Sequence, residues 1–195
     1  MFLFGASGHG KVIAEIAESN KITIDGFIDT DVSKTELLGY NVFHKSPKNT
    51  IAVIITIGNN KTRKKVVEEN PLFTHPKLFS QNANISKRSI LGDGTVVMAG
   101  VSINTDVFIG KHCIINTNAS VDHDCVIQDF VHLSPNVALA GNVNVGEGTH
   151  IGIGACVIQG ITIGKWCTIG AGAVIIKNIP DGCTVVGNPG KIIKR

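Results

Sequence analysis

The sequence predicts an α/β, Rossmann-like N-terminal domain followed by a left-handed parallel β-helix of hexapeptide repeats. Three observations support this fold class. Every sixth residue from Ile85 to Ile175 is Ile, Leu or Val. The first 80 residues instead alternate apolar strand-like runs, glycine loops and amphipathic helical segments. The whole chain contains 22 Gly but only eight Phe, one Trp and one Tyr, so its core is mainly aliphatic.

The composition narrows the class of protein. The chain has 195 residues, and 18 Lys and Arg against 15 Asp and Glu give a formal net charge of only +3. This charge is too small and too scattered for a nucleic-acid surface. No apolar run reaches the ~18–20 residues of a membrane span, and the N-terminus lacks the basic start of a signal peptide. The five Cys show no CxxC spacing, which favours a reducing cytoplasm over a disulfide framework.

The six-residue repeat predicts a stack of short strands. A period of six fits neither a helix nor a flat strand, but it fits a short strand plus a corner, with the large residue pointing inward. A smaller residue follows each large one by four positions, as Ala119 follows Ile115. Three such sides form a coil of about 18 residues, and coils stack about 4.8 Å apart. Residues 85–174 therefore give about five coils, and residues 175–195 are expected to cap them.

The N-terminal part predicts a small parallel α/β unit. We expect, in chain order, a strand at 1–4, a helix at 11–18, strands at 22–28 and 51–57, and a helix at 61–69. The unbroken β-branched run at 51–57 is typical of a parallel strand that is buried on both faces. His75-Pro76 breaks this pattern, so residues 73–80 are expected to form a junction. The predicted domains are therefore 1–80 and 81–195.

A glycine loop follows the first predicted strand. The segment Gly5–Gly10 has the form Gly-x-x-Gly-x-Gly, which differs from the Gly-x-Gly-x-x-Gly of dinucleotide enzymes. Its backbone N–H groups and the following helix N-terminus suit a pyrophosphate. Asp29 ends the second strand, where an acid can contact a ribose or a base. The alternatives are a tight turn and an ordinary turn aspartate. NAD chemistry is not expected, because only a fragment of that fold is present.

Histidines are the main titratable candidates within the repeat. His123 occupies the third position of its hexad, beside Asp124. An imidazole titrates near neutral pH, and an adjacent carboxylate can raise its basicity and fix its tautomer. Gly141 lies one coil after His123 and should stand directly above it. His132 and His150 are also one coil apart, so they should stack about 4.8 Å apart.

The two halves together resemble the bacterial nucleotide-amino-sugar acetyltransferases of the hexapeptide-repeat superfamily. The most similar members are the N-acetyltransferases of UDP- or dTDP-4-amino sugars, which are grouped with the sialic acid O-acetyltransferases. The resemblance covers nearly the whole chain. It rests on the segments Gly5-Ala6-Ser7-Gly8-His9-Gly10, Gly58-Asn59-Asn60 with Arg63, Val121-Asp122-His123-Asp124-Cys125, His132-Leu133-Ser134-Pro135 and Val186-Gly187-Asn188-Pro189.

The resemblance implies a reaction and a site. An acetyl group would pass directly from acetyl-CoA to the amine of a nucleotide-linked 4-amino sugar in glycan biosynthesis, without a metal, in a cytoplasmic homotrimer with active sites between neighbouring β-helices. His123 would be the general base, supported by Asp124. The residues implied to bind the nucleotide sugar are Ser7, Gly8, His9, Asp29, Thr30, Gly58 and Arg63. Those implied to lie near acetyl-CoA are His132, Gly141, Ile153, Gly154 and Gly172.

Three other functions remain open from the sequence. An O-acetyltransferase acting on sialic acid or a related sugar would use the same base to activate a hydroxyl. A zinc hydratase on a β-helix would need two histidines five residues apart plus a third from another coil, and the spacings of His112, His123, His132 and His150 do not supply them. A trimeric scaffold without activity would leave the glycine loop and the Asp122-His123-Asp124 element unexplained.

Overall fold

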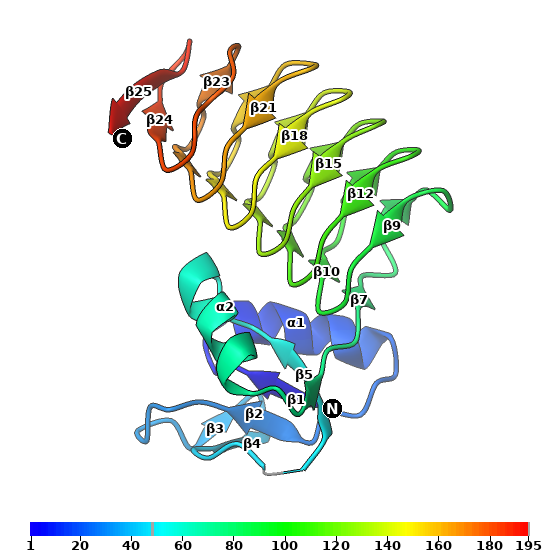
Figure 1. Ribbon diagram of the computed structural model, residues 1–195. Coiled ribbons are helices and arrows are strands. Elements are labelled where there is room, and N and C mark those ends of the chain that lie inside the picture. The colour runs from blue at the N-terminus through cyan, green and yellow to red at the C-terminus, as the bar shows by residue number, and fades with distance from the viewer. Residues whose placement is uncertain (48, 195) are drawn as a thin grey trace.

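The computed structural model describes residues 1–47 and 49–194 and shows an α/β part packed against a β-helix (Figure 1). The elements of the α/β part are β1 (Phe2–Phe4), α1 (Gly8–Ser19), β2 (Gly26–Ile28), β3 (Glu36–Leu37), β4 (Tyr40–Phe43), β5 (Ile51–Ile55), α2 (Asn60–Glu69) and β6 (Phe73–Thr74). Its strands lie in the order β3-β4-β2-β1-β5-β6, and all neighbours are parallel except β3 and β4.

The β-helix is built from two-residue strands and ends in two longer ones. These are β7 (Leu78–Phe79), β8 (Asn84–Ile85), β9 (Ile90–Leu91), β10 (Val96–Val97), β11 (Ser102–Ile103), β12 (Phe108–Ile109), β13 (Ile114–Ile115), β14 (Ser120–Val121), β15 (Val126–Ile127), β16 (His132–Leu133), β17 (Ala138–Leu139), β18 (Asn144–Val145), β19 (His150–Ile151), β20 (Cys156–Val157), β21 (Thr162–Ile163), β22 (Thr168–Ile169), β23 (Val174–Ile175), β24 (Thr184–Val186) and β25 (Lys191–Lys194). Every third strand joins the same sheet, which confirms the predicted fold class.

The central strands of the α/β part are shorter than predicted. β1 pairs with β2 on one side and with β5 on the other. Because β1 ends at Phe4, before the glycine loop, it pairs only with Gly26–Ile28 and Val53–Ile55. The predicted strands at 22–28 and 51–57 are thus limited by the length of their neighbour. Helix α1 begins at Gly8, inside the glycine loop, rather than at the predicted residue 11.

The hexad pattern gives the β-helix its core. The large residue of each hexad is the second residue of a strand, and Ile109 and Ile115 are fully buried there. The smaller residue four positions later is also buried, as at Ala119 and Cys125. Ile115 pairs with Leu133 in the next coil, so each column of the core repeats every eighteen residues. The predicted inward and small positions are therefore confirmed.

The fourth residue of the hexad forms the corner between strands. Its backbone adopts positive φ in coil after coil, a conformation that Gly, Asn and Asp tolerate best. The non-glycine residues at this position are Asp106, His112, Asn118, Asp124, Phe130, Asn136, Asn142 and Trp166. Three of them, His112, Phe130 and Trp166, are bulky and lie on the same corner. That corner faces the α/β part.

The β-helix begins before the predicted boundary. β7 pairs in parallel with β10, so residues 78 and 79 belong to the first coil rather than to a junction. Phe79 occupies the inward position one step before Ile85, and the aliphatic pattern missed it because it is aromatic. At the other end, β24 continues the sheet of β22, and β25 turns back antiparallel to it. This reversal forms the cap expected after residue 175.

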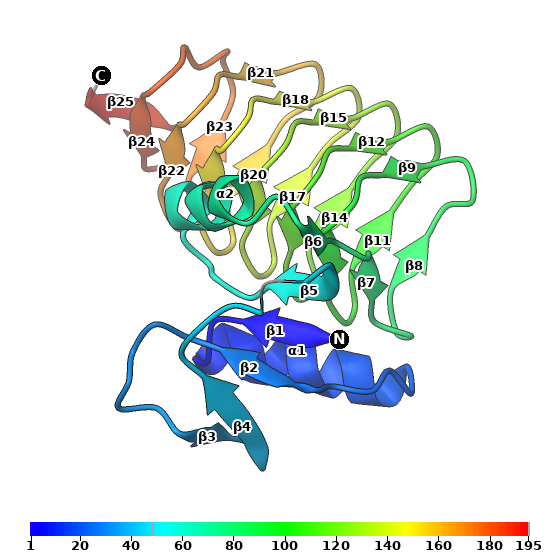
Figure 2. The same cartoon turned by 60° about the horizontal axis from the view of Figure 1, so that its bottom comes forward.

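The two parts share an apolar interface. Ile13 and Ala17 of α1 belong to one buried cluster with Val96 and Ile114 of the β-helix. In Figure 1, α1 accordingly lies between the N-terminal sheet and the coils, and Figures 1 and 2 both show α2 beside the coils. Val66 of α2 packs into a separate cluster on the other face of the sheet. The interface therefore fixes the carboxyl ends of β1, β2 and β5 relative to the β-helix.

Arg63 of α2 fastens this interface with hydrogen bonds. Its Nε donates to the carbonyl of His112 at 2.8 Å, and Nη2 donates to the carbonyl of Phe130 at 2.8 Å. Nη1 donates to the carbonyls of Ile57 and Gly58, and Nη2 also donates to Asn60 Oδ1. Burial lowers the pKa of Arg63 to about 10, so it stays a cation at neutral pH. All five N–H groups of the guanidinium are thereby used inside the chain.

We predict that Arg63→Met destabilises the fold by about 3 kcal/mol or more, because it leaves buried carbonyls of both parts without donors. Urea denaturation followed by circular dichroism measures the change. Lys65→Met is the matched control on α2, since Lys65 is 72% exposed and, within the described residues, forms an ion pair only with the exposed Glu69. It should change the unfolding free energy by less than about 0.5 kcal/mol. Equal small effects of both substitutions would contradict the role assigned to Arg63.

Candidate active site

The glycine loop lies at the carboxyl end of β1. Gly5 has a φ of +119°, and a Cβ on Gly10 would stand 2.5 Å from the Gly5 carbonyl oxygen, so the fold itself requires both glycines. A Cβ on Gly8 would meet nothing within 4 Å. Ser7 precedes α1 without making a side-chain cap, and the first turn of α1 holds no acidic residue. The first turn of α1 therefore holds neither a side-chain cap nor an acidic group that would compete with an anion.

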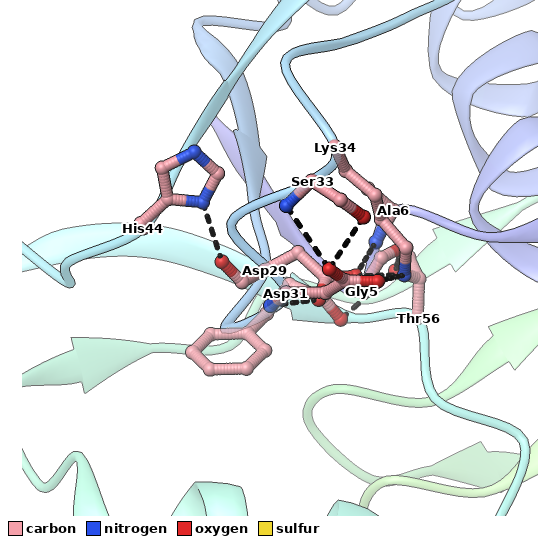
Figure 3. A network of polar contacts seen from close by, with 9 residues as sticks. Gly5, Ala6, Asp29, Asp31, Ser33, Lys34, His44 and Thr56 are labelled. Atoms are coloured by element: carbon pink, nitrogen blue, oxygen red, sulfur yellow. Dashed lines mark hydrogen bonds and ion pairs between the residues drawn. The ribbon is translucent and has the colours of Figure 1, made fainter.

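Asp29 is anchored beside this loop, as Figure 3 shows. Its Oδ2 accepts hydrogen bonds from the backbone N–H of Ala6 and from Lys34 Nζ, both at 2.8 Å. Its Oδ1 accepts the backbone N–H of Asp31 at 3.0 Å. Burial opposes ionisation of Asp29, but the bonds from Lys34 and from the two backbone groups keep its pKa below the usual value. The carboxylate therefore holds the glycine loop and Lys34 in place.

The other predicted nucleotide-sugar residues lie around the same edge of the sheet. Ser7 and Thr30 are exposed, at the ends of β1 and β2. His9 is half-buried, and burial lowers its pKa to about 4. Its buried Nε2 makes no hydrogen bond within the described residues. Arg63 departs from its predicted role, because every guanidinium N–H is bound inside the chain and none is left for a ligand.

A cavity of about 490 Å³ lies where this edge meets the β-helix. Gly58 lines it from the β5–α2 loop, and His132, His150 and Trp166 line it from the coils. A Cβ on Gly58 would meet nothing within 4 Å, so this loop leaves the cavity open. The cavity thus brings together residues that the sequence assigns to two different ligands, the nucleotide sugar and acetyl-CoA.

His132 is held firmly at the wall of this cavity. Its Nδ1 donates to the Gly58 carbonyl at 3.3 Å, and its Nε2 accepts from Asn116 Nδ2 at 3.2 Å. Its ring stacks on that of His150 with centroids 4.8 Å apart, which confirms the predicted stacking. Burial, followed by the nearby His150 and Arg63, lowers the pKa of His132 to about 3. His132 is therefore a neutral group at physiological pH.

His123 and Asp124 form an exposed pair at the corner after β14. His123 Nδ1 donates to Asp124 Oδ2 at 2.8 Å, and the two side chains are 54% and 62% exposed. This bond, and then the charge of Asp122, raises the pKa of His123. Asp124 occupies the corner position with φ +58°. Because Nδ1 carries the proton in this bond, Nε2 of the neutral imidazole is the nitrogen that can accept one.

Gly141 stands directly above the imidazole, as predicted. A Cβ at this position would come within 2.7 Å of His123 Nε2, so only glycine leaves that nitrogen accessible. The remaining predicted acetyl-CoA residues lie on later coils. Ile153 is 52% exposed, and Gly154 and Gly172 occupy left-handed corners with open space beside them.

The structure separates the predicted residues into two groups within one chain. His123 lines a hollow of about 430 Å³ on the β-helix, whereas His132 lines the cavity at the interface of the two parts. The sequence analysis did not select three residues that lie near these sites, namely Lys34, Asn104 and Trp166. Of these, only Asn104 could have been found from the repeat, because it lies one coil before Asp122.

Among the described residues, no group of three or more His, Cys, Asp or Glu side chains is arranged to hold a metal ion. In the same part of the chain, neither helix has the length and apolar character needed to cross a membrane.

Comparison with known families identifies both parts of the chain. Residues 1–70 match the family described as the PglD N-terminal domain. Residues 142–177 match the family of bacterial transferase hexapeptide repeats. A curated relative, the UDP-N-acetylbacillosamine N-acetyltransferase of Bacillus subtilis, is 41% identical over 108 residues. That match spans half of this chain and half the length of the relative.

Two solved structures match over essentially their whole length. One is a His→Asn variant of perosamine N-acetyltransferase from Caulobacter crescentus in complex with CoA and GDP-perosamine. It is 35% identical, with a TM-score of 0.95 over 100% of this chain and 96% of that one. The other is the acetyltransferase domain of PglB from Neisseria gonorrhoeae in complex with acetyl coenzyme A, 39% identical, with a TM-score of 0.90 over 98% of each chain. The protein therefore belongs to the amino-sugar N-acetyltransferases that join a PglD-type N-terminal domain to a hexapeptide-repeat β-helix.

Proposed function

We propose that this protein transfers the acetyl group of acetyl-CoA to the amine of a nucleotide-linked 4-amino sugar in bacterial glycan biosynthesis, with His123 as general base. The observation that carries the proposal is the His123–Asp124 pair, which leaves Nε2 accessible beneath Gly141. The relatives support it, since one was solved with CoA and GDP-perosamine and another with acetyl coenzyme A. The cytoplasm, expected from the Cys pattern, is part of the proposal.

The chemistry follows from the state of the two side chains. The bound sugar ammonium first releases one proton to solvent. As the neutral nitrogen then bonds to the thioester carbonyl carbon, His123 Nε2 takes a second proton. Asp124 keeps the tautomer with Nδ1 protonated and stabilises the imidazolium that forms. The carbon–sulfur bond breaks, and the imidazolium protonates the departing thiolate. A backbone N–H near Gly141 would hold the oxyanion.

The two parts of the chain divide the work in this proposal. The α/β part holds the nucleotide sugar, with its diphosphate at the start of α1 beside Ser7, Gly8 and His9, and with Gly58 at the sugar end. The β-helix carries acetyl transfer. The relative solved with GDP-perosamine shows that guanine nucleotides belong in a substrate panel beside the UDP and dTDP sugars expected from the sequence.

The proposed active enzyme is a homotrimer. In a single chain the His123 hollow and the interface cavity are lined by separate residues. A neighbouring β-helix would bring the His123 corner of one subunit toward the cavity of the next, in a cyclic arrangement. Acetyl-CoA would then run between subunits, past Ile153, Gly154 and Gly172.

Removing the base should abolish most of the activity. We expect His123→Ala to lower kcat by about 10²–10⁴-fold with little change in either KM, because a positioned general base contributes that much to proton transfer. Thiol release from acetyl-CoA, measured against UDP-, dTDP- and GDP-4-amino sugars with CMP-sialic acid and free sialic acid as hydroxyl acceptors, gives these constants. A loss below threefold, or a wild-type protein active only on the hydroxyl acceptors, would overturn the proposal.

The supporting carboxylate should set the pH dependence. In Asp124→Asn an amide oxygen can still accept from Nδ1, but the negative charge that strengthens this bond and raises the imidazolium pKa is lost. The acidic limb of the kcat/KM profile should therefore move to lower pH. The loss of kcat should be smaller than in His123→Ala. Asp106→Asn is a matched control, because Asp106 occupies the same corner one coil earlier with the same backbone conformation. An unmoved acidic limb in Asp124→Asn would contradict the pairing.

The assembly can be measured directly. We expect light scattering to give about 62 kDa, three times the chain mass of 20.6 kDa. A monomer that retains full acetyltransferase activity would contradict a site shared between subunits.

A further inference from the structure

A second carboxylate lies beside the base and is not used in the steps above. Asp122 directly follows β14, and its Oδ1 accepts two hydrogen bonds at 2.8 Å. One comes from the backbone N–H of His123 and the other from Asn104 Nδ2. Asn104 follows β11 in the preceding coil, whose Ser102 pairs with Ser120 of β14. The register of the repeat thus places an amide beneath this carboxylate and fixes its orientation.

The Asp122 carboxylate faces an open hollow. Asn84, Ser86, Thr105 and Asn104 line this hollow together with Asp122 and His123. Within the described residues, no Lys or Arg forms an ion pair with Asp122. Asp122 Oδ2 makes no hydrogen bond within the same described residues, so this oxygen can accept hydrogen bonds from a ligand.

The charged groups on both sides of His123 are therefore negative. Asp122 and Asp124 flank His123, which is neutral when it is ready to accept a proton. The hydrogen bonds from Asn104 and from the His123 backbone lower the pKa of Asp122, so it is ionised at neutral pH. A cation that enters the hollow meets the Asp122 carboxylate, and no Lys or Arg is among the residues that line the hollow. A neutral acceptor gains none of this attraction.

We propose that Asp122, held by Asn104, binds the ammonium group of the acceptor sugar and makes the site select amines over hydroxyls. This inference rests on the proposed acetyltransferase function and deepens it. The ammonium would donate one hydrogen bond to Asp122 Oδ2 and present another N–H to His123 Nε2. After deprotonation the bond to Asp122 persists and orients the nitrogen lone pair toward the thioester carbon.

Asp122→Asn tests the charge while keeping the geometry, since the amide oxygen can still accept the bonds from Asn104 and His123. The KM for the best 4-amino sugar should rise about tenfold or more, because a charge-assisted hydrogen bond becomes a neutral one. The KM for acetyl-CoA and the inhibition constant of the corresponding 4-hydroxy nucleotide sugar should not change. Asp129→Asn is the control, because Asp129 is a half-buried carboxylate that accepts a backbone N–H from Lys111 on another corner.

A second measurement avoids any substitution. In the wild-type enzyme, raising salt from about 50 to about 500 mM should raise the KM for the amino sugar more than the inhibition constant of its hydroxyl counterpart, because charges in an open hollow are screened. Equal effects of Asp122→Asn on amine and hydroxyl ligands, or equal salt dependences, would overturn the inference. Wild-type protein that acetylates no amino sugar would instead contradict the proposed function itself.

Discussion

The stacking of coils at a fixed register is the constraint on which the rest of the structure depends. Each coil places a residue directly above its counterpart eighteen positions earlier, as the pairing of His132 with His150 shows. The same rule sets Gly141 over His123 and Asn104 under Asp122. The geometry around His123 in the proposed active site thus follows from backbone hydrogen bonding between coils, and no flexible loop is needed to assemble it.

The second constraint is the attachment of the α/β part to this stack. Helix α1 buries apolar surface against the coils. Arg63 adds directional hydrogen bonds to the carbonyls of the corner residues His112 and Phe130. Asn60 adds a bond to the carbonyl of Gly148 on the same corner. These three carbonyls lie on the same corner of three successive coils. The hydrogen bonds to them therefore fix the position of the α/β part along the axis of the β-helix as well as around it.

The features that could be predicted from the sequence are those that depend on the six-residue period. The inward aliphatic positions, the small corner fillers, the His132–His150 stack and the place of Gly141 all follow from counting residues. Contacts between the α/β part and the β-helix could not be predicted in this way, because no repeat relates Arg63 to His112 or Phe130. The inward role of Phe79, where an aromatic residue replaces the aliphatic one, was also missed. The sequence places Asp29 at the end of the second strand, but it does not show that the carboxylate oxygens accept hydrogen bonds from Ala6, Asp31 and Lys34.

The bulky corner residues bear on how such a repetitive chain finds a single alignment. With an aliphatic residue at nearly every inward position, a slip by one whole coil would leave the core almost unchanged. The bulky corner residues distinguish these alignments. The ring of Trp166 fills the space that a Cβ on Gly148 would need, and the ring of His112 fills the space beside Gly94. After a slip, Trp166 would be placed over Phe130 instead. The pairing of large rings with glycines at this corner therefore favours one alignment of the coils over its neighbours.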